Sequence, residues 1–356
     1  MAMLFNRKWS KAELLCRVGH MDQLAGIRLL EAGDGKARGC RMLDVWTGTG
    51  LRFQENAERA LDILSCDFKG MPLSWRSPGG DVHPAYYEPQ GIGWLRSFPG
   101  GLLTTCGLDQ FGLPSQNSGA ELGLHRRISN LPASQVNYRT IWAGDDYELE
   151  ITGEVRQAAL FGENLVLRRR IAAVLGSNRI RIEDVITNEG FEPAPHILLY
   201  HFNLGFPLVS EDTRLRLRSE ETLPRDVTAQ SGLAEWDRFQ PPKLGYHEQV
   251  FIHHPVADEE GIATVELNNP QMSFGLRWTY GTANLPYLME WKMMGEGAYV
   301  VGVEPANCNG LGGRSATREL GQLPQLEPGE SRDYHFDVEV IPIKGKCHEQ
   351  HTIPHA

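Results

Sequence analysis

The chain has 356 residues, of which 35 are Lys or Arg and 45 are Asp or Glu, so its formal net charge at pH 7 is −10. This acidic balance argues against nucleic acid and against an anionic membrane surface as partners, because both would require a basic patch. Hydrophobic residues make up 41% and charged residues 22%, as in a globular protein, and the 38 Gly and 21 Pro favour many turns over long helices.

The first predicted element is a helix over residues 11–30, where apolar side chains recur at helical spacing. From about residue 40 onward, short apolar or alternating runs are broken by Gly, Pro, Asn or Asp, which is typical of antiparallel β-structure. Two runs, 179–188 and 332–340, alternate cleanly and are expected to have one face in a core and the other in water.

No internal repeat or linker divides the chain. We therefore expect an N-terminal helical decoration (1–39), one large all-β domain (40–342) and a loosely attached tail (343–356). The polar, Pro-containing segment 210–242 is interpreted as a long excursion on the surface.

The composition also bears on location and on metal chemistry. No stretch approaches the roughly 18 apolar residues of a membrane helix, and the N-terminus lacks a secretory signal, so we expect a cytoplasmic protein. The absence of HExxH and of paired CxxC motifs argues against a metal site, and we expect no cofactor. Scattered cysteines predict reduced, mostly buried thiols; they are Cys16, Cys40, Cys66, Cys106, Cys308 and Cys347.

Two residues are the main candidates for acid–base chemistry. Glu304 ends a β-branched run at a Glu-Pro step, where partial desolvation would raise its proton affinity; the alternative is a solvated carboxylate at a strand end. His201 lies in the apolar run 195–208, and Asn203, two residues on, would share its face of a strand. The alternative for His201 is a buried structural histidine, which is our interpretation of His196.

Weaker candidates for holding a ligand are scattered along the chain. Arg96, beside Trp94 in a Gly-rich segment, offers hydrogen-bond donors next to an aromatic ring, a combination that suits sugars. Five further polar or aromatic residues complete the candidate substrate-binding set: His125, His247, Glu248, Trp291 and Lys292.

Over residues 40–342 the sequence resembles the galactose mutarotase (aldose 1-epimerase) superfamily, and within it a bacterial aldose 1-epimerase-like branch. The residues that carry the resemblance occur in the same order as in the family: Leu124-His125, Asn130-Leu-Pro-Ala, His201 in its apolar strand, Val303-Glu304-Pro305, and Leu326-Glu-Pro-Gly-Glu-Ser-Arg-Asp-Tyr. Three features depart from the family pattern: Arg126 replaces a glycine, Glu248 replaces an aspartate, and His201 and Asn203 are only two residues apart where the family usually reads His-x-x-x-Asn.

The resemblance implies a β-supersandwich with a sugar cleft and ring opening at the anomeric carbon without a cofactor. In family terms Glu304 is the general base and His201 the general acid, which we expect to lie about one sugar ring apart in one cleft. The partner would be a small-molecule sugar. Two alternatives stay open on the same fold: a non-catalytic carbohydrate-binding or regulatory protein, and an isomerase or lyase for a modified sugar.

Overall fold

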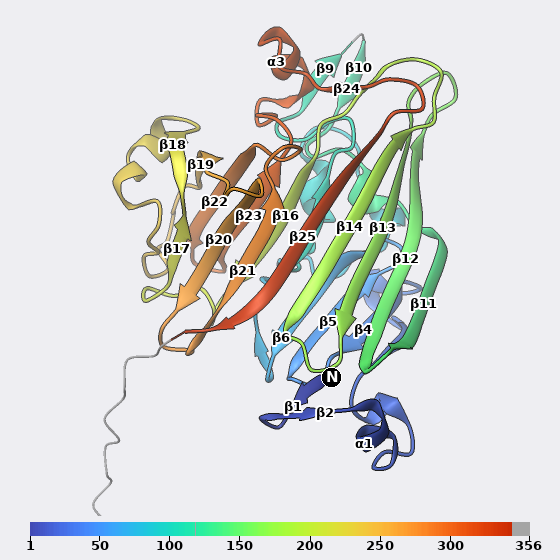
Figure 1. The fold of residues 1–356 in the computed structure, drawn as a ribbon. Helices are drawn as coiled ribbons and strands as arrows, with labels where there is room; N and C mark the ends of the chain where they lie inside the picture. Colours follow the sequence, from blue (N-terminus) through green and yellow to red (C-terminus); the bar gives the residue numbers. More distant parts are fainter. Residues whose placement is uncertain (118, 344–356) are drawn as a thin grey trace, which may run out of the picture.

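The computed structural model describes residues 1–117 and 119–343, and its regular structure consists mainly of antiparallel strands (Figure 1). The largest sheet has eight strands, in the order β11 (Ser134–Ala143), β12 (Asp146–Ala158), β13 (Asn164–Val174), β14 (Arg179–Asn188), β25 (Ser331–Pro342), β21 (Phe274–Gly281), β20 (Ile262–Asn269) and β17 (Arg214–Leu217). A six-stranded sheet follows the order β18 (Ser219–Pro224), β19 (Gln249–Pro255), β22 (Tyr287–Gly295), β23 (Ala298–Ala306), β16 (Leu199–Gly205) and β8 (Leu103–Cys106).

The remaining elements are smaller. A five-stranded sheet contains β3 (Gly26–Glu31), β4 (Arg41–Trp46), β5 (Leu51–Asn56), β6 (Asp62–Phe68) and β7 (Met71–Pro72). Three two-stranded pairs are β1 (Ala2–Leu4) with β2 (Arg7–Trp9), β9 (Ser115–Asn117) with β10 (Ala120–Leu122), and β15 (Ala194–Pro195) with β24 (Gln325–Leu326). The α-helices are α1 (Lys11–Leu15), α2 (Val227–Gln230) and α3 (Gly313–Glu319). None of the helices in the described ranges is long and apolar enough to cross a membrane.

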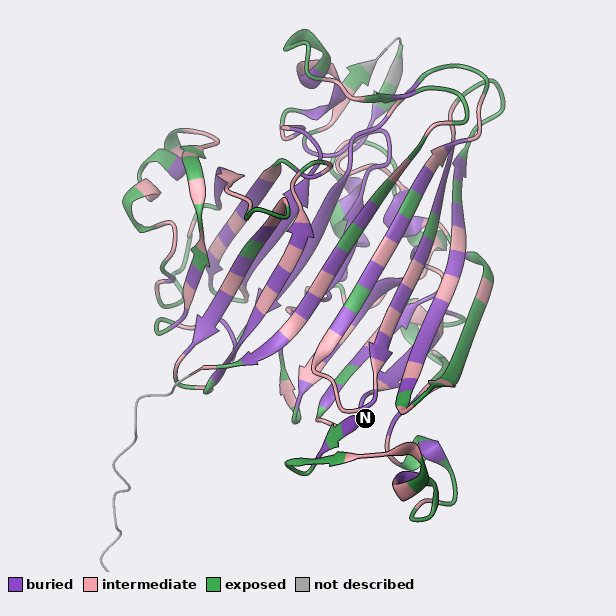
Figure 2. Cartoon of the chain, viewed as in Figure 1, coloured by how far each residue is buried: buried purple, intermediate pink, exposed green. Residues whose placement is uncertain are grey.

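The main core lies between the eight-stranded and six-stranded sheets. Tyr200 and Phe202 of β16 pack against Phe336 of β25, with ring centroids 4.5 and 5.7 Å apart. Phe202 also meets Trp278 of β21 edge-on at 5.9 Å. Each such ring removes a large apolar area from water, worth about 1.5–3 kcal/mol per side chain. The predicted alternation over 179–188 and 332–340 is confirmed, since β14 and β25 bury every second residue (Figure 2).

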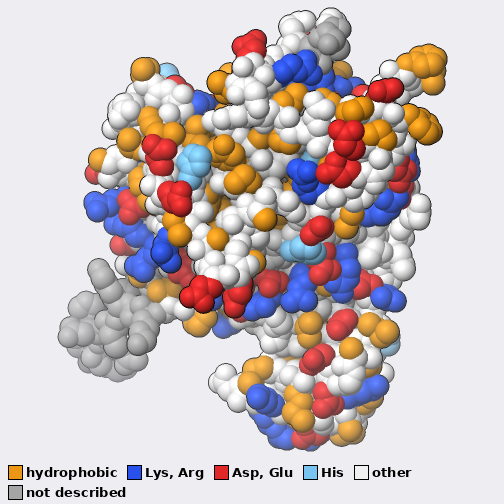
Figure 3. Space-filling model, turned by 45° about the horizontal axis from the view of Figure 1, so that its top comes forward, with side chains coloured by type: hydrophobic (Ala, Val, Ile, Leu, Met, Phe, Trp, Pro, Cys, Tyr) orange, Lys and Arg blue, Asp and Glu red, His pale blue; other side chains and the backbone are white. Residues whose placement is uncertain are grey.

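The outer face of the eight-stranded sheet carries rows of opposite charges. Glu150 of β12 accepts from Arg139 of β11 at 2.7 Å and from Arg170 of β13 at 2.6 Å, and Arg170 continues the row to Glu183 of β14. Acidic and basic side chains are likewise interspersed over the face shown in Figure 3. The outer face of the eight-stranded sheet is therefore polar and in contact with water, as the alternating pattern predicts.

A buried ion cluster ties the three large sheets together. The Arg169 guanidinium of β13 is fully buried and binds Asp184 of β14 at 2.7 Å and Asp62 of β6 at 2.9 Å. It also donates to the Thr105 hydroxyl of β8, while the Tyr200 hydroxyl of β16 donates to Asp184. Removing one partner would leave a buried charge uncompensated, at a cost of about 3–5 kcal/mol. The cluster therefore holds β8 and β16 in a fixed position.

The helix predicted over residues 11–30 is wrong beyond Leu15. A capping box of Ser10 and Glu13 starts α1, but the chain then passes through a short 3-10 turn and continues as β3. β3 pairs with β4, so part of the N-terminal segment belongs to a sheet. Among the described cysteines Cys16 is exposed and the other four are buried and free, as predicted; Cys347 and most of the predicted tail lie outside the described residues.

Candidate active site

The six-stranded sheet is buried on both faces, and His201 and Glu304 lie on the face turned away from the main core. β16 alternates strictly: Tyr200 and Phe202 enter the core, so His201 and Asn203 point to the other side. β23 pairs with β16 in a register that places Phe202 opposite Val303 and therefore brings His201 beside Glu304. The Nε2 atom of His201 lies 3.1 Å from Oε1 of Glu304.

This contact is short but is not aligned as a hydrogen bond, since Oε1 of Glu304 and Nδ1 of His201 both lack hydrogen-bond partners among the described residues. Both side chains retain a small exposed fraction, 7% for His201 and 5% for Glu304. The predicted separation of about one sugar ring is wrong: the two groups are in direct contact because adjacent strands carry them. Each therefore keeps hydrogen-bonding capacity for a third group.

Gly302 makes room for the Glu304 carboxylate. It precedes Glu304 by two residues on β23 and therefore shares its face of the sheet. A Cβ atom at position 302 would lie 2.2 Å from Oε1 of Glu304 and 3.0 Å from Cβ of Trp291. A glycine is thus required for the carboxylate to occupy this position.

The electrostatics of the site favour uncharged forms of both groups. Burial raises the pKa of the Glu304 carboxyl well above its usual range; the nearby Glu248 carboxylate adds to this shift, and Arg225 opposes it. Burial lowers the pKa of the His201 imidazole well below its usual value. Burial likewise lowers the pKa of His125 to about 4. The geometry therefore combines a carboxyl group that retains its proton with an imidazole that has a free lone pair.

Aromatic rings surround the imidazole of His201. The rings of Phe98, Trp291 and His125 have centroids 5.3, 5.5 and 5.9 Å from it. Trp94 stacks on Phe98 at 4.4 Å and touches His125 at 4.6 Å, so the loop that carries these residues covers the sheet. This lining excludes water and provides flat apolar faces of the kind on which sugar rings pack.

A polar chain at the rim fixes Trp291. Its indole Nε1 donates to Oε2 of Glu248 at 2.8 Å, and the Arg225 guanidinium donates to Oε1 of the same carboxylate at 3.0 Å. Arg225 also pairs with Asp226, the N-cap of α2, at 2.8 Å. The segment 210–242, predicted as a surface excursion, therefore contributes strands to two sheets and an arginine to this site.

Comparison with known proteins shows which family the chain belongs to. The family model "Domain of unknown function (DUF4432)" matches residues 37–340. The chain belongs to the DUF4432 family. No curated protein matches this DUF4432 member.

Solved structures show that its fold is the galactose mutarotase-like β-supersandwich. The structure of a "putative aldose 1-epimerase" from Klebsiella pneumoniae is 27% identical in sequence and superposes with a TM-score of 0.85. The alignment covers 91% of this chain and 87% of the Klebsiella chain. A galactose mutarotase-like protein from Clostridium acetobutylicum (12% identity, 90% and 100% coverage) gives 0.64. The galactose 1-epimerase of Lactobacillus acidophilus (12% identity, 90% and 99% coverage) gives 0.58.

The fold of this DUF4432 protein brings most of the predicted site residues together. Six of the nine lie in or at the rim of this site: Glu304, His201, Asn203, His125, Glu248 and Trp291. Asn203 is fully buried and donates to the His201 carbonyl at 2.9 Å, while its own Oδ1 has no partner among the described residues.

Three candidate residues lie elsewhere. Lys292 follows Trp291 on β22 and therefore points to the opposite face, where its Nζ donates to the Glu235 carbonyl at 2.9 Å. Arg96 is largely exposed and pairs with Glu88 at 3.2 Å. His247 is exposed. His196 is buried between the Leu108 carbonyl and the Tyr334 hydroxyl, as expected of a structural histidine.

Sequence reasoning did not identify three contributors to the site, namely Arg225, Phe98 and Gly302. Gly302 could have been found from its alternation with Glu304 in a predicted strand. Arg225 and Phe98 come from loops whose sequence carries no periodic signal, and their places depend on long-range packing. No group of three His, Cys, Asp or Glu side chains within the described ranges could hold a metal ion.

Proposed function

We propose that this protein interconverts the anomers of a free aldose by acid–base ring opening, with His201 and Glu304 as the proton-transferring pair. The observation that carries the proposal is the 3.1 Å contact between an imidazole nitrogen and a carboxyl oxygen that are not hydrogen-bonded to each other. The two reacting oxygens of a cyclic aldose are bonded to the same carbon. A proton donor and a proton acceptor in direct contact therefore match them without either group having to move.

Over one catalytic cycle His201 and Glu304 return to the protonation states in which they began. Because burial raises the pKa of Glu304 and lowers that of His201, we assign the two roles in the opposite order from the one that the family resemblance implies. In the uncharged pair, the His201 imidazole accepts the proton of the anomeric hydroxyl while the Glu304 carboxyl gives its proton to the ring oxygen. The bond between the anomeric carbon and the ring oxygen breaks, and an aldehyde forms. After the aldehyde rotates, the carboxylate takes the proton of the attacking hydroxyl and the imidazolium protonates the aldehyde oxygen, which restores the uncharged pair.

The lining favours an uncharged sugar over a sugar phosphate. A phosphate group calls for several unpaired Arg or Lys side chains. Lys292 lies on the other face of the sheet, Arg225 is paired with two carboxylates, and Arg96 is paired with Glu88. The aromatic rings beside His201 instead suit the apolar face of a neutral pyranose.

The test is anomeric exchange of a panel of aldoses, measured by NMR with wild-type protein and with Glu304→Gln. The amide retains the shape of the side chain but cannot exchange a proton, so we expect the rate to fall by about 10²–10⁴-fold. Sugar binding, followed by intrinsic fluorescence, should persist. Unchanged exchange in the variant would refute the assignment of Glu304. Binding without exchange by the wild-type protein would instead favour the carbohydrate-binding alternative.

A further inference from the structure

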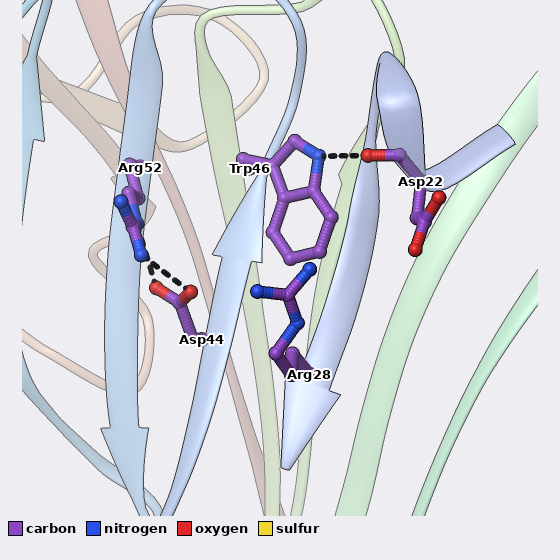
Figure 4. A pocket seen from close by; sticks show the side chains of 5 residues that line it. All are labelled: Asp22, Arg28, Asp44, Trp46 and Arg52. Atoms are coloured by element: carbon purple, nitrogen blue, oxygen red, sulfur yellow. Dashed lines mark hydrogen bonds and ion pairs between the residues drawn. The ribbon is translucent and has the colours of Figure 1, made fainter. Parts of the chain in front are cut away.

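A hollow lies on the outer face of the five-stranded sheet, and none of its residues belongs to the site described above (Figure 4). Its volume is about 260 Å³. It is formed by β3, β4 and β5 together with the short turn before β3, and its lining consists of Asp22, Arg28, Asp44, Trp46 and Arg52. We call it the Trp46 hollow.

The indole of Trp46 is held in place from two sides. Its Nε1 donates to the Asp22 carbonyl at 2.9 Å. Gly26 lies opposite Trp46 in the β3–β4 register, and a Cβ atom there would lie 2.7 Å from the indole ring. The ring therefore rests on the bare backbone of β3, and a ligand would meet an aromatic surface that is already ordered.

The charged side chains of the hollow are paired unevenly. Arg28 lies directly opposite Asp44 in the register, yet both carboxylate oxygens of Asp44 accept from Arg52, at 2.7 and 2.6 Å. Arg28 makes no ion pair within the described residues, and its guanidinium lies 5.2 Å from the centroid of the Trp46 ring. A set of donors next to an aromatic ring is thus left without an acceptor.

The lining indicates the chemical class of the ligand. Two arginines and two aspartates cancel in formal charge, which disfavours a simple anion or cation. The Asp22 carboxylate points away from Trp46 and contacts His20 at 2.6 Å (Figure 4). The acceptors in the hollow are therefore the two Asp44 oxygens, each of which already accepts one hydrogen bond from Arg52, and Arg28 offers donors. Groups that donate and accept at once, beside an apolar ring face, match the hydroxyls and the C–H face of a pyranose. We propose that the Trp46 hollow is a second, non-catalytic binding site for a saccharide ring.

The test uses ligands that cannot undergo ring opening. The protein is labelled with 5-fluorotryptophan, and the ¹⁹F signals of Trp46 and Trp291 are assigned with Trp46→Phe and Trp291→Phe variants. Methyl glycosides of common hexoses are then titrated, with a linear trisaccharide as a second arm, because a free sugar and the terminal ring of a longer glycan share the same chemistry. We expect a saturable shift of the Trp46 signal with a dissociation constant in the millimolar range.

Two comparisons make the result decisive. Arg28→Met retains the apolar stem but removes the donors, and should weaken saccharide binding at Trp46 about tenfold while leaving anomeric exchange unchanged. Sodium acetate serves as the anion probe. A Trp46 signal that does not move with any saccharide, or moves only with acetate, would overturn the proposal. Because Trp291 reports the His201–Glu304 site separately, failure of the proposed reaction would leave this result intact.

Discussion

Gly302→Ala tests directly whether the position of the Glu304 carboxylate matters. The added methyl group would lie 2.2 Å from Oε1, whereas ordinary contacts begin at 3.4 Å. The carboxylate must therefore retreat by about 1 Å, a displacement that costs on the order of 100-fold in rate when it affects a reacting group. We expect kcat/KM for anomeric exchange to fall about 100-fold, which corresponds to ~2.7 kcal/mol of lost transition-state stabilisation.

The fold should tolerate this change. The most crowded atom is the end of a flexible side chain, and Cβ of Trp291, at 3.0 Å, has to give by only a few tenths of an ångström. Alanine is also intrinsically favoured over glycine inside a strand by about 0.5–1 kcal/mol. The thermal midpoint should accordingly stay close to that of the wild type. Gly281→Ala is the matched control, since Gly281 also lies in a strand and a Cβ atom there would meet nothing within 4 Å.

The assay follows the decay of optical rotation of freshly dissolved α-anomer, with NMR exchange for slower variants. Wild-type turnover in a folded Gly302→Ala protein would refute the reasoning, because the carboxylate would then have moved without consequence. Equal losses in both glycine variants would point to a general effect on the sheets.

Two further outcomes are expected. Arg225→Met removes one hydrogen bond from the Glu248 carboxylate, which holds the Trp291 indole. Because the Arg225–Glu248 pair is partly exposed, kcat/KM should fall about fivefold, and the fluorescence of Trp291 should change. Lys292→Met, on the opposite face of the sheet, is the control and should change neither quantity. Burial lowers the pKa of His196 from 6.5 to about 4, so its contribution to stability is complete above pH 6.5 and is lost as the pH falls towards 4, by ~3 kcal/mol. Burial also lowers the pKa values of His125 and His201, so these two add to the same slope. Chemical denaturation at a series of pH values should show the slope, and His196→Gln should reduce it by the share of His196 without abolishing it.

Alternation along strands was the most informative part of the sequence. It identified β14 and β25 and predicted that His201 and Asn203 share one face of a strand; that this face is turned away from the main core is known only from the packing of Tyr200 and Phe202. The same rule could have excluded Lys292 from the site, because adjacent strand residues cannot share a face with Trp291.

The misassigned helix has a related cause. Over 11–30 the apolar spacing fits a helix, but the last five residues of that segment belong to β3, whose side chains Leu29 and Leu30 remain substantially exposed. β3 is the edge strand of its sheet, where apolar side chains can stay exposed. Apolar spacing alone therefore could not distinguish this strand from a helix. The rim pair of Arg225 and Glu248 was beyond reach for another reason: it joins residues of two segments whose approach depends on the β18–β19–β22 pairing.

The pairing of β16 with β23 also limits the orientation in which a sugar could bind at the site. His201 and Glu304 are carried by adjacent strands whose opposite faces are packed against the main core, so the two groups cannot separate without breaking the β16–β23 register. In the proposed reaction, a sugar would therefore meet both from one side and would have to present the anomeric hydroxyl and the ring oxygen together. Only the edge of the ring that carries the anomeric carbon offers this arrangement. In this orientation the rings of Phe98 and Trp291, which lie beside His201, would face the sugar ring while its reacting edge points at the pair.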